Sequence, residues 1–347
     1  MEATNDDPSR PLYVDESPLA DVAVSLGGVL SFTRRQPGRS EVLVWNTRTS
    51  PKPVPWLAET LPVRSLFGFD GRRVFAHTGT EILLIEDGRA VSLHRSVGEI
   101  LSPAASPDGE KLVWIEPGEP AVLWRSDRST GARVALEVRG TCVRCCFSSS
   151  NEVIAVCLDE GGADGDPEGN RAVLGSSVWL SREDVQPQLV ASFPGAAILD
   201  VVPHPVRPQV VLSVSSEKRG TDHDLEGAVS SRFPIAGTVS SGVWAAEIGG
   251  DGKVVRLAEE SARAGGLRWF GQDEVVFSAV SCRYPASVLM VAGSAGLHAL
   301  RVAQFIDQLA VDETSGAVVY RVLRAGHSEV RALSVESIRQ GQHLGQV

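Results

Sequence analysis

The sequence has no apolar run that approaches the roughly 18 residues needed to cross a bilayer. Residues 1–7 are acidic and polar, so the N-terminal segment lacks both the basic and the apolar stretch of a secretory signal. These two absences lead us to expect a soluble, cytoplasmic protein without a membrane partner.

Cysteine is scarce, with five residues, an odd number, of which three crowd together. A chain of 347 residues can bury a large core without cross-links, so this pattern does not indicate a disulfide framework. Cys142 and Cys145 have the spacing of some metal ligands. Successive side chains of a strand point to opposite faces, however, which predicts that these two thiols cannot hold one ion. We expect buried, reduced thiols.

Basic residues are fewer than acidic ones. Lys and Arg number 33 against 43 Asp and Glu, which gives a formal net charge of -10, and the basic residues are scattered. Nucleic-acid-binding proteins usually carry a basic stripe that neutralises phosphates. We therefore do not expect a nucleic-acid partner.

Short apolar segments and turn residues are abundant, with 34 Gly and 20 Pro. Seven similar apolar segments recur and predict the second strand of seven repeats; they begin at residues 29, 74, 112, 153, 210, 275 and 318. A third strand ends in Trp in four repeats, at positions 45, 124, 179 and 244. The spacing is near the roughly 40 residues of a four-stranded propeller blade, apart from two longer intervals.

The sequence therefore predicts an all-β fold, a single seven-bladed β-propeller of four-stranded antiparallel blades over residues 16–347. Residues 1–15 are expected to form an N-terminal tail. Within that tail, residues 12–14 are a candidate closing strand, sharing closure of the ring with residues 342–347.

One repeat carries a sharper motif. Its turn, Ser106-Pro107-Asp108-Gly109, precedes the apolar segment Leu112-Val113-Trp114, and Val122-Leu123-Trp124 follows. This stretch resembles the repeat of TolB-type propellers, which also builds the propeller of prolyl-oligopeptidase-type serine peptidases. In those peptidases an α/β-hydrolase domain carries the catalytic serine. The resemblance implies a propeller of this kind, and we expect the α/β-hydrolase domain to be missing.

Two connections between second and third strands are long, at about residues 159–175 and 216–240. In propellers such connections lie on one rim, beside the central channel, and long loops on a rigid scaffold are often functional or else disordered. We expect the rim of blades four and five to bind a peptide, a protein partner or a small molecule.

The first of these loops has the spacing of a calcium site. Asp164, Asp166, Glu168 and Asn170 stand at every second position, with glycine at the sixth position. The twelfth position is also glycine instead of a bidentate acid, and the composition is equally typical of a solvated loop. Calcium is a candidate ligand, and no other cofactor is predicted.

Charged residues fall at comparable positions of the predicted innermost strands. The candidate ligand-binding residues are Arg64, Arg144, Arg268, Trp269 and Asp307, with Asp21, Glu99 and Asp200 at or near similar positions. Arginine binds carboxylates through two parallel hydrogen bonds, which suits a zwitterion, a peptide terminus or a carboxylate. A ring of structural salt bridges facing water is the alternative.

A catalytic site is the second hypothesis for the same channel mouth. Its candidate acids and bases are Asp200, His204 and His223, serving a cofactor-independent hydrolase, lyase or cyclase. Ser294 has a sequence context similar to a nucleophile elbow, but it falls in a predicted hairpin instead of a strand-to-helix turn. Because no nucleophile, metal or cofactor motif emerges, binding is the preferred hypothesis.

Overall fold

The computed structural model describes residues 10–25, 28–57, 60–160, 173–215, 242–249, 253–259, 263–280, 287–293, 296–302, 306–324 and 326–340. Within these ranges there are 28 β-strands and one short helix, and the strands form seven four-stranded sheets. Seven such antiparallel sheets define a seven-bladed β-propeller, which confirms the fold predicted from the sequence. Among the described residues, no helix has the length and apolar character needed to span a membrane.

The chain divides into two compact units. The first unit, Met1–Ala105 with Ala264–Val347, contains blades one, two, six and seven. Blade one is β2 (Leu19–Val24), β3 (Val29–Gln36), β4 (Arg39–Asn46) and β5 (Val54–Pro55). Blade two is β6 (Ser65–Phe69), β7 (Arg73–His77), β8 (Glu81–Glu86) and β9 (Arg89–Arg95). Blade six is β22 (Arg263–Phe270), β23 (Glu274–Val280), β24 (Ser287–Gly293) and β25 (Gly296–Val302).

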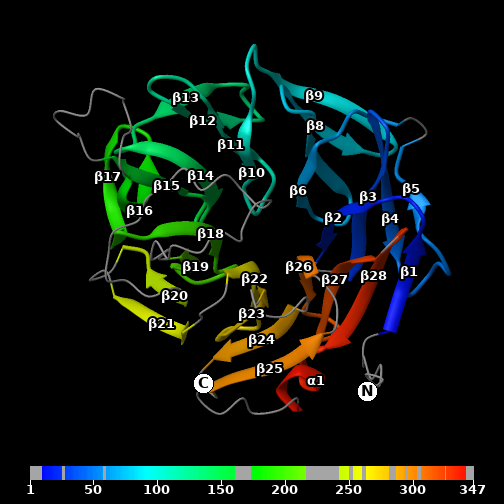
Figure 1. Ribbon diagram of the computed structural model, residues 1–347. Coiled ribbons are helices and arrows are strands. Elements are labelled where there is room, and N and C mark those ends of the chain that lie inside the picture. Colours follow the sequence, from blue (N-terminus) through cyan, green and yellow to red (C-terminus); the bar gives the residue numbers. More distant parts are fainter. Residues whose placement is uncertain are drawn as a thin grey trace. The chain divides into compact units, whose positions relative to one another are not determined.

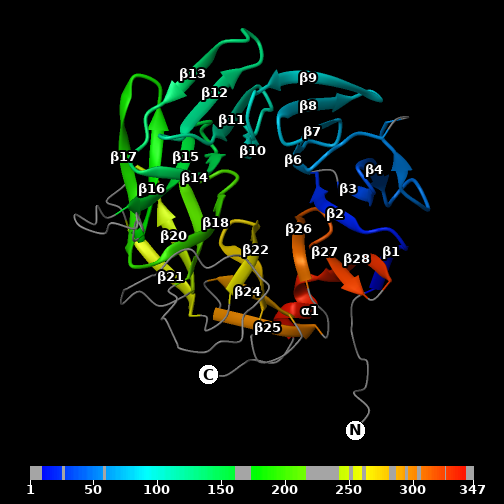
Figure 2. The same ribbon diagram turned by 45° about the horizontal axis from the view of Figure 1, so that its top comes forward.

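Blade seven differs from the others because its strands come from both ends of the sequence. It is β26 (Ile306–Asp312), β27 (Ala317–Arg324), β28 (His327–Ser334) and β1 (Arg10–Asp15). The N-terminal strand β1 is thus the outer strand of this blade and runs antiparallel to β28, as both views show (Figures 1 and 2). The predicted closing residues 12–14 lie in β1; residues 342–347 lie outside the described residues. Helix α1 (Val335–Gln340) follows β28.

The second unit, Ser106–Arg263, contains blades four and five and most of blade three. Blade three is β10 (Leu101–Ala105), β11 (Lys111–Glu116), β12 (Val122–Asp127) and β13 (Arg133–Leu136). Blade four is β14 (Thr141–Phe147), β15 (Val153–Glu160), β16 (Val173–Arg182) and β17 (Val185–Pro194). Blade five is β18 (Ala197–Pro203), β19 (Gln209–Ser215), β20 (Gly242–Glu247) and β21 (Val254–Glu259).

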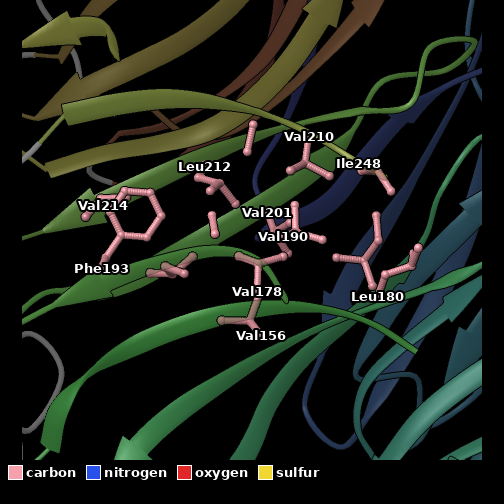
Figure 3. Packing of buried hydrophobic residues seen from close by; sticks show 14 of the residues in the cluster. Val156, Val178, Leu180, Val190, Phe193, Val201, Val210, Leu212, Val214 and Ile248 are labelled. Atoms are coloured by element: carbon pink, nitrogen blue, oxygen red, sulfur yellow. The ribbon is translucent and has the colours of Figure 1, made fainter. Parts of the chain in front are cut away.

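The core explains why the second and third strands are continuous apolar runs. A propeller sheet is covered on both faces, so consecutive residues are buried whichever way they point. Between blades four and five, Val156 and Val178 of one sheet pack with Val210 and Leu212 of the next (Figure 3). The first strands of successive blades are the inner ones, since they contact each other: β26 with β2, β2 with β6, and β14 with β18.

The inner strands share an irregularity that the sequence did not reveal. In blades one, two, four, five and seven, the first strand contains one more residue than the segment of the second strand opposite it. Such a bulge shifts the alternation of side chains along the strand. It therefore decides which inner-strand side chains share a face.

Candidate ligand-binding site on the inner strands

In the first unit, Asp21 is the centre of a polar cluster. It lies in the bulge of β2 with a φ of 57°, and its side chain is buried. The Thr33 hydroxyl donates a hydrogen bond to Asp21 Oδ2 at 2.8 Å, and the Arg35 guanidinium lies 3.5 Å from the same oxygen. The bulge thus places one carboxylate against groups of the neighbouring strand β3.

The cluster also connects three blades. From blade seven, Arg321 Nη1 donates to the carbonyl oxygen of Leu19, and Gln308 Oε1 accepts from the Val22 amide at 3.2 Å. Toward blade two, Arg35 Nη2 donates to the carbonyl oxygen of Arg64 at 2.6 Å. The inner-strand ends of blades seven, one and two are therefore held together by side-chain hydrogen bonds.

The electrostatics of Asp21 reflect competing effects. Burial raises the pKa of the Asp21 carboxyl, and the Thr33 hydrogen bond and the charges of Arg35 and Arg321 only partly oppose this. Burial likewise lowers the pKa of Arg321, which the charge of Asp21 counteracts. The Thr33 hydrogen bond and then the two arginines therefore offset part of the cost of burying this carboxylate.

Arg64 continues the cluster toward solvent. Its guanidinium pairs with Glu99, and both side chains are about half exposed, at 57% and 47%. Gly79, with a φ of 108°, lies beneath the arginine, and a Cβ there would come within 3.3 Å of Arg64 Cδ. Arg64 and Glu99 thus present opposite charges side by side at an accessible surface.

His77 is buried behind this pair. Among the described residues its Nδ1 has no hydrogen-bond partner. Burial and then the charge of Arg64 lower the pKa of His77, with Glu99 acting in the opposite direction. The imidazole is therefore held neutral near physiological pH.

The remaining predicted binding residues are distributed over both units. Arg268 Nη1 donates to the carbonyl oxygen of Leu267 at 2.6 Å, and the neighbouring Trp269 is buried at 8% exposure. Asp307 lies at the bulge of β26, and its side chain is outside what the structure describes. In the second unit, Arg144 is exposed on β14.

Asp200 is on the inner strand of blade five, in the second unit. Its Oδ1 accepts a hydrogen bond from the Val201 amide at 3.0 Å. Burial, and secondarily the charge of Asp200, raise the pKa of the Cys146 thiol to about 12. This places the carboxylate near the inner strand of blade four, where Arg144 also lies.

The fully buried His204 stands at the turn between β18 and β19. Its Nδ1 accepts hydrogen bonds from the amides of Val206 at 3.1 Å and Arg207 at 2.9 Å. Ser106 and Ser148 occupy the corresponding turns of blades three and four and accept amide hydrogen bonds in the same way. The histidine is thus a turn-capping residue, at the opposite end of β19 from residue 216.

We expect His204→Ala to lower the free energy of unfolding by about 1–3 kcal/mol, since two amides lose their acceptor. His204→Asp should lose less, because Asp70 caps the equivalent turn of blade two through the amides of Arg72 and Arg73. Urea unfolding measures both, with Val206→Ala, a 70% exposed position in the same turn, as the control. Equal stability of the alanine variant and wild type would contradict the capping role.

The loop predictions fall on residues that the structure does not describe. These are His223 and the calcium candidates Asp164, Asp166, Glu168 and Asn170. Within the described ranges, no group of three or more His, Cys, Asp or Glu side chains is arranged to hold a metal ion. The polar groups that can be followed atom by atom are therefore those of the inner strands.

Sequence reasoning found Asp21, Arg64 and Glu99 but missed their partners. Thr33 and Arg35 lie on the second strand of blade one, and Arg321 lies on the second strand of blade seven. A polar residue near the end of an otherwise apolar strand was the available signal.

The fold and this site define the class of protein as a seven-bladed propeller with a charged inner-strand cluster. No protein-family model matches the sequence, and no curated protein is similar to it in sequence. Among solved structures, it is similar to the β-propeller domain of the trilobed protease from Pyrococcus furiosus. That match has 12% identity and a TM-score of 0.63, and covers 92% of this chain and 96% of that chain.

Two further structures have the same fold. A puromycin-hydrolyzing peptidase from Mycobacterium tuberculosis matches with 14% identity and a TM-score of 0.65, over 95% of this chain and 53% of that chain. Hydrazine synthase from Kuenenia stuttgartiensis matches with 11% identity and a TM-score of 0.59, over 95% of this chain and 97% of that chain. This chain therefore spans about half the length of the peptidase, and the likenesses concern the fold.

Proposed function

We propose that this protein is a binding propeller that recognises a peptide at the inner-strand ends of its first unit. The observation that carries the proposal is the exposed Arg64–Glu99 ion pair. Arg35 donates a hydrogen bond to the Arg64 carbonyl oxygen, and Gly79 lies against the Arg64 side chain. Arg64 would bind a carboxylate of the peptide, and Glu99 would bind an ammonium group.

The physical argument rests on preorganisation. The carbonyl oxygen of Arg64 is bound by Arg35, which itself lies against the buried Asp21, so the backbone under the arginine is held in place. An exposed ion pair contributes little to stability, about 0–1 kcal/mol. The ion pair between Arg64 and Glu99 can therefore open, and each side chain can bind a ligand group instead, with little loss of folding free energy. Two of the similar structures belong to a protease and a peptidase, which supports a peptide as the ligand.

A catalytic function receives less support from the described residues. His204, a predicted acid or base, has its Nδ1 engaged by two backbone amides. Burial lowers the pKa of His77, and its Nδ1 atom is enclosed away from solvent. Binding without turnover is therefore the function that we propose.

The test uses a short alanine peptide with a free C-terminal carboxylate and the same peptide amidated, titrated by calorimetry. We expect Arg64→Ala to weaken binding of the free-carboxylate peptide at least about 10-fold, because a charge-assisted bidentate contact is lost. Arg48→Ala, an exposed arginine in an outer turn of the same unit, should leave the affinity unchanged. The amidated peptide should bind wild type about as weakly as the free peptide binds the Arg64 variant.

Other results would place the binding site elsewhere or contradict the proposal. Loss of binding in Arg144→Ala, with Arg64→Ala unaffected, would place recognition on blades four and five, where the long loops were predicted. A charge exchange, Arg64→Glu with Glu99→Arg, should preserve the ion pair and stability but not the affinity. If that double variant binds as well as wild type, or if wild type binds neither peptide, the proposal is wrong.

A further inference from the structure

Four cysteines lie within the described residues, all in the first two strands of blade four, and none is in a disulfide. Simple alternation places Cys142 and Cys145 on opposite faces of β14, as we expected from the sequence. That expectation is wrong, because the bulge at Val143 adds one residue between them.

The packing around the bulge confirms which face each thiol occupies. Val143 and Cys146 both pack against the apolar cluster between blades four and five, so they point to the same side. Cys142 and Cys145 must then point to the other side. Cys157 of β15 is directly opposite Cys142 in the register and shares its face.

The opposed position gives Cys142 and Cys157 a backbone separation that a disulfide can span. Directly opposed residues of antiparallel strands have Cα atoms about 4.5–5.5 Å apart, within the range of about 4.4–6.8 Å that disulfides span. Cys142 is 3% exposed and Cys157 is 0% exposed, so both are enclosed by the sheet. Gly140, with a φ of 84°, brings the chain entering β14 close to Cys157, since a Cβ there would lie 3.6 Å from Cys157 Cβ.

We propose that Cys142 and Cys157 are a redox-active thiol pair, oxidised to a cross-strand disulfide by a low-molecular-weight disulfide. Two protein S–H bonds break and one protein S–S bond forms. The S–S bond of the reagent breaks to give two small thiols, which receive the two electrons and two protons that the protein loses. No metal or further reactant is required.

The position of the pair explains how the reagent reaches it. Cys142 is the second residue of β14, and Cys157 lies three residues before the end of β15. Strand ends open more readily than strand centres, which exposes the pair transiently. The cross-link would tie the inner strand, which carries the exposed Arg144, to its neighbour. Oxidation therefore restrains the inner edge of blade four without changing its register.

The test incubates the full-length native protein with oxidised glutathione, followed by digestion without reduction and peptide mapping by mass spectrometry. We expect a linked pair of peptides containing Cys142 and Cys157, lighter than the separate peptides by two hydrogen atoms. Dithiothreitol should reverse the linkage. The oxidised protein should unfold at a higher temperature than the reduced protein, because the closed loop restricts the unfolded chain.

Variants separate the pair from its neighbours. Cys142→Ser and Cys157→Ser should each abolish the linked peptides, whereas Cys146→Ser, on the opposite face, should retain them. Wild type that yields only glutathione adducts, no change, or a linkage through Cys145 or Cys282 would overturn the proposal. The wild-type mapping decides the question even if a serine variant fails to fold.

Discussion

Deletion of residues 1–15 is expected to destabilise the protein by roughly 3–5 kcal/mol or more, the cost of truncating a large core aromatic, because it removes an entire strand. Strand β1 supplies the outer edge of blade seven and pairs with β28. Tyr13 packs against Phe32 and Trp45 of blade one, with ring centroids 5.6 and 6.2 Å apart. The loss of β1 exposes these aromatic side chains and leaves β28 as an open edge strand.

Thermal unfolding and light scattering measure this effect. The truncated protein should unfold at a markedly lower temperature and aggregate through the exposed edge of β28. Deletion of residues 1–7 is the matched control, because it leaves β1 intact and should unfold like wild type. The unfolding temperature of Tyr13→Ala should lie between those of the two deletion variants. A full deletion that unfolds at the control temperature would show that β1 contributes little to closure.

Glu329→Ala is expected to cost about 3–5 kcal/mol at neutral pH, because it removes the shared partner of two arginines and a histidine inside the fold. The Glu329 side chain is 7% exposed. Its oxygens lie 2.6 Å from Arg331 Nε, 2.9 Å from Arg324 Nε and 2.8 Å from His327 Nε2. Without the carboxylate, the guanidinium groups of Arg324 and Arg331 lose this counter-charge inside blade seven.

The pH dependence gives this prediction a second measurement. Burial raises the pKa of Glu329, but the hydrogen bonds from Arg331 and His327 and the nearby arginine charges outweigh it, so the pKa lies below its ordinary value of 4.5. A lowered carboxyl pKa stabilises the fold above the ordinary value, and this share is lost as the pH falls through the lowered one. The stability difference between wild type and Glu329→Gln should therefore shrink in acid.

Urea unfolding at neutral and acidic pH tests both statements. Glu313→Ala, an exposed acid in the turn between β26 and β27 of the same blade, is the control and should change stability by less than about 0.5 kcal/mol. If Glu329→Ala behaves like Glu313→Ala, the three contacts do not stabilise blade seven. If the stability difference between wild type and Glu329→Gln is the same at acidic and neutral pH, the lowered pKa of Glu329 is contradicted.

The candidate site was only partly predictable. Arg64, Glu99 and Asp21 could be found because the blades repeat, so that equivalent inner-strand positions can be aligned. The contacts between blades seven and one could not, because the hydrogen bonds from Arg321 to the Leu19 carbonyl and from the Val22 amide to Gln308 join residues 302 and 286 positions apart. His204 was placed among catalytic candidates because a histidine that caps a turn has no local signature distinguishing it from a catalytic one.

The sequence by itself determined the number and kind of blades in this protein. Each sheet is covered on both faces, so the second strand of every blade is a continuous apolar run, and this run recurs seven times along the chain. Tertiary structure alone decided that β1 completes blade seven, that a bulge turns Cys142 and Cys145 to one face, and which charged groups meet at Arg64. These depend on register and on contacts between distant segments, where one extra residue in a strand changes which side chains are neighbours.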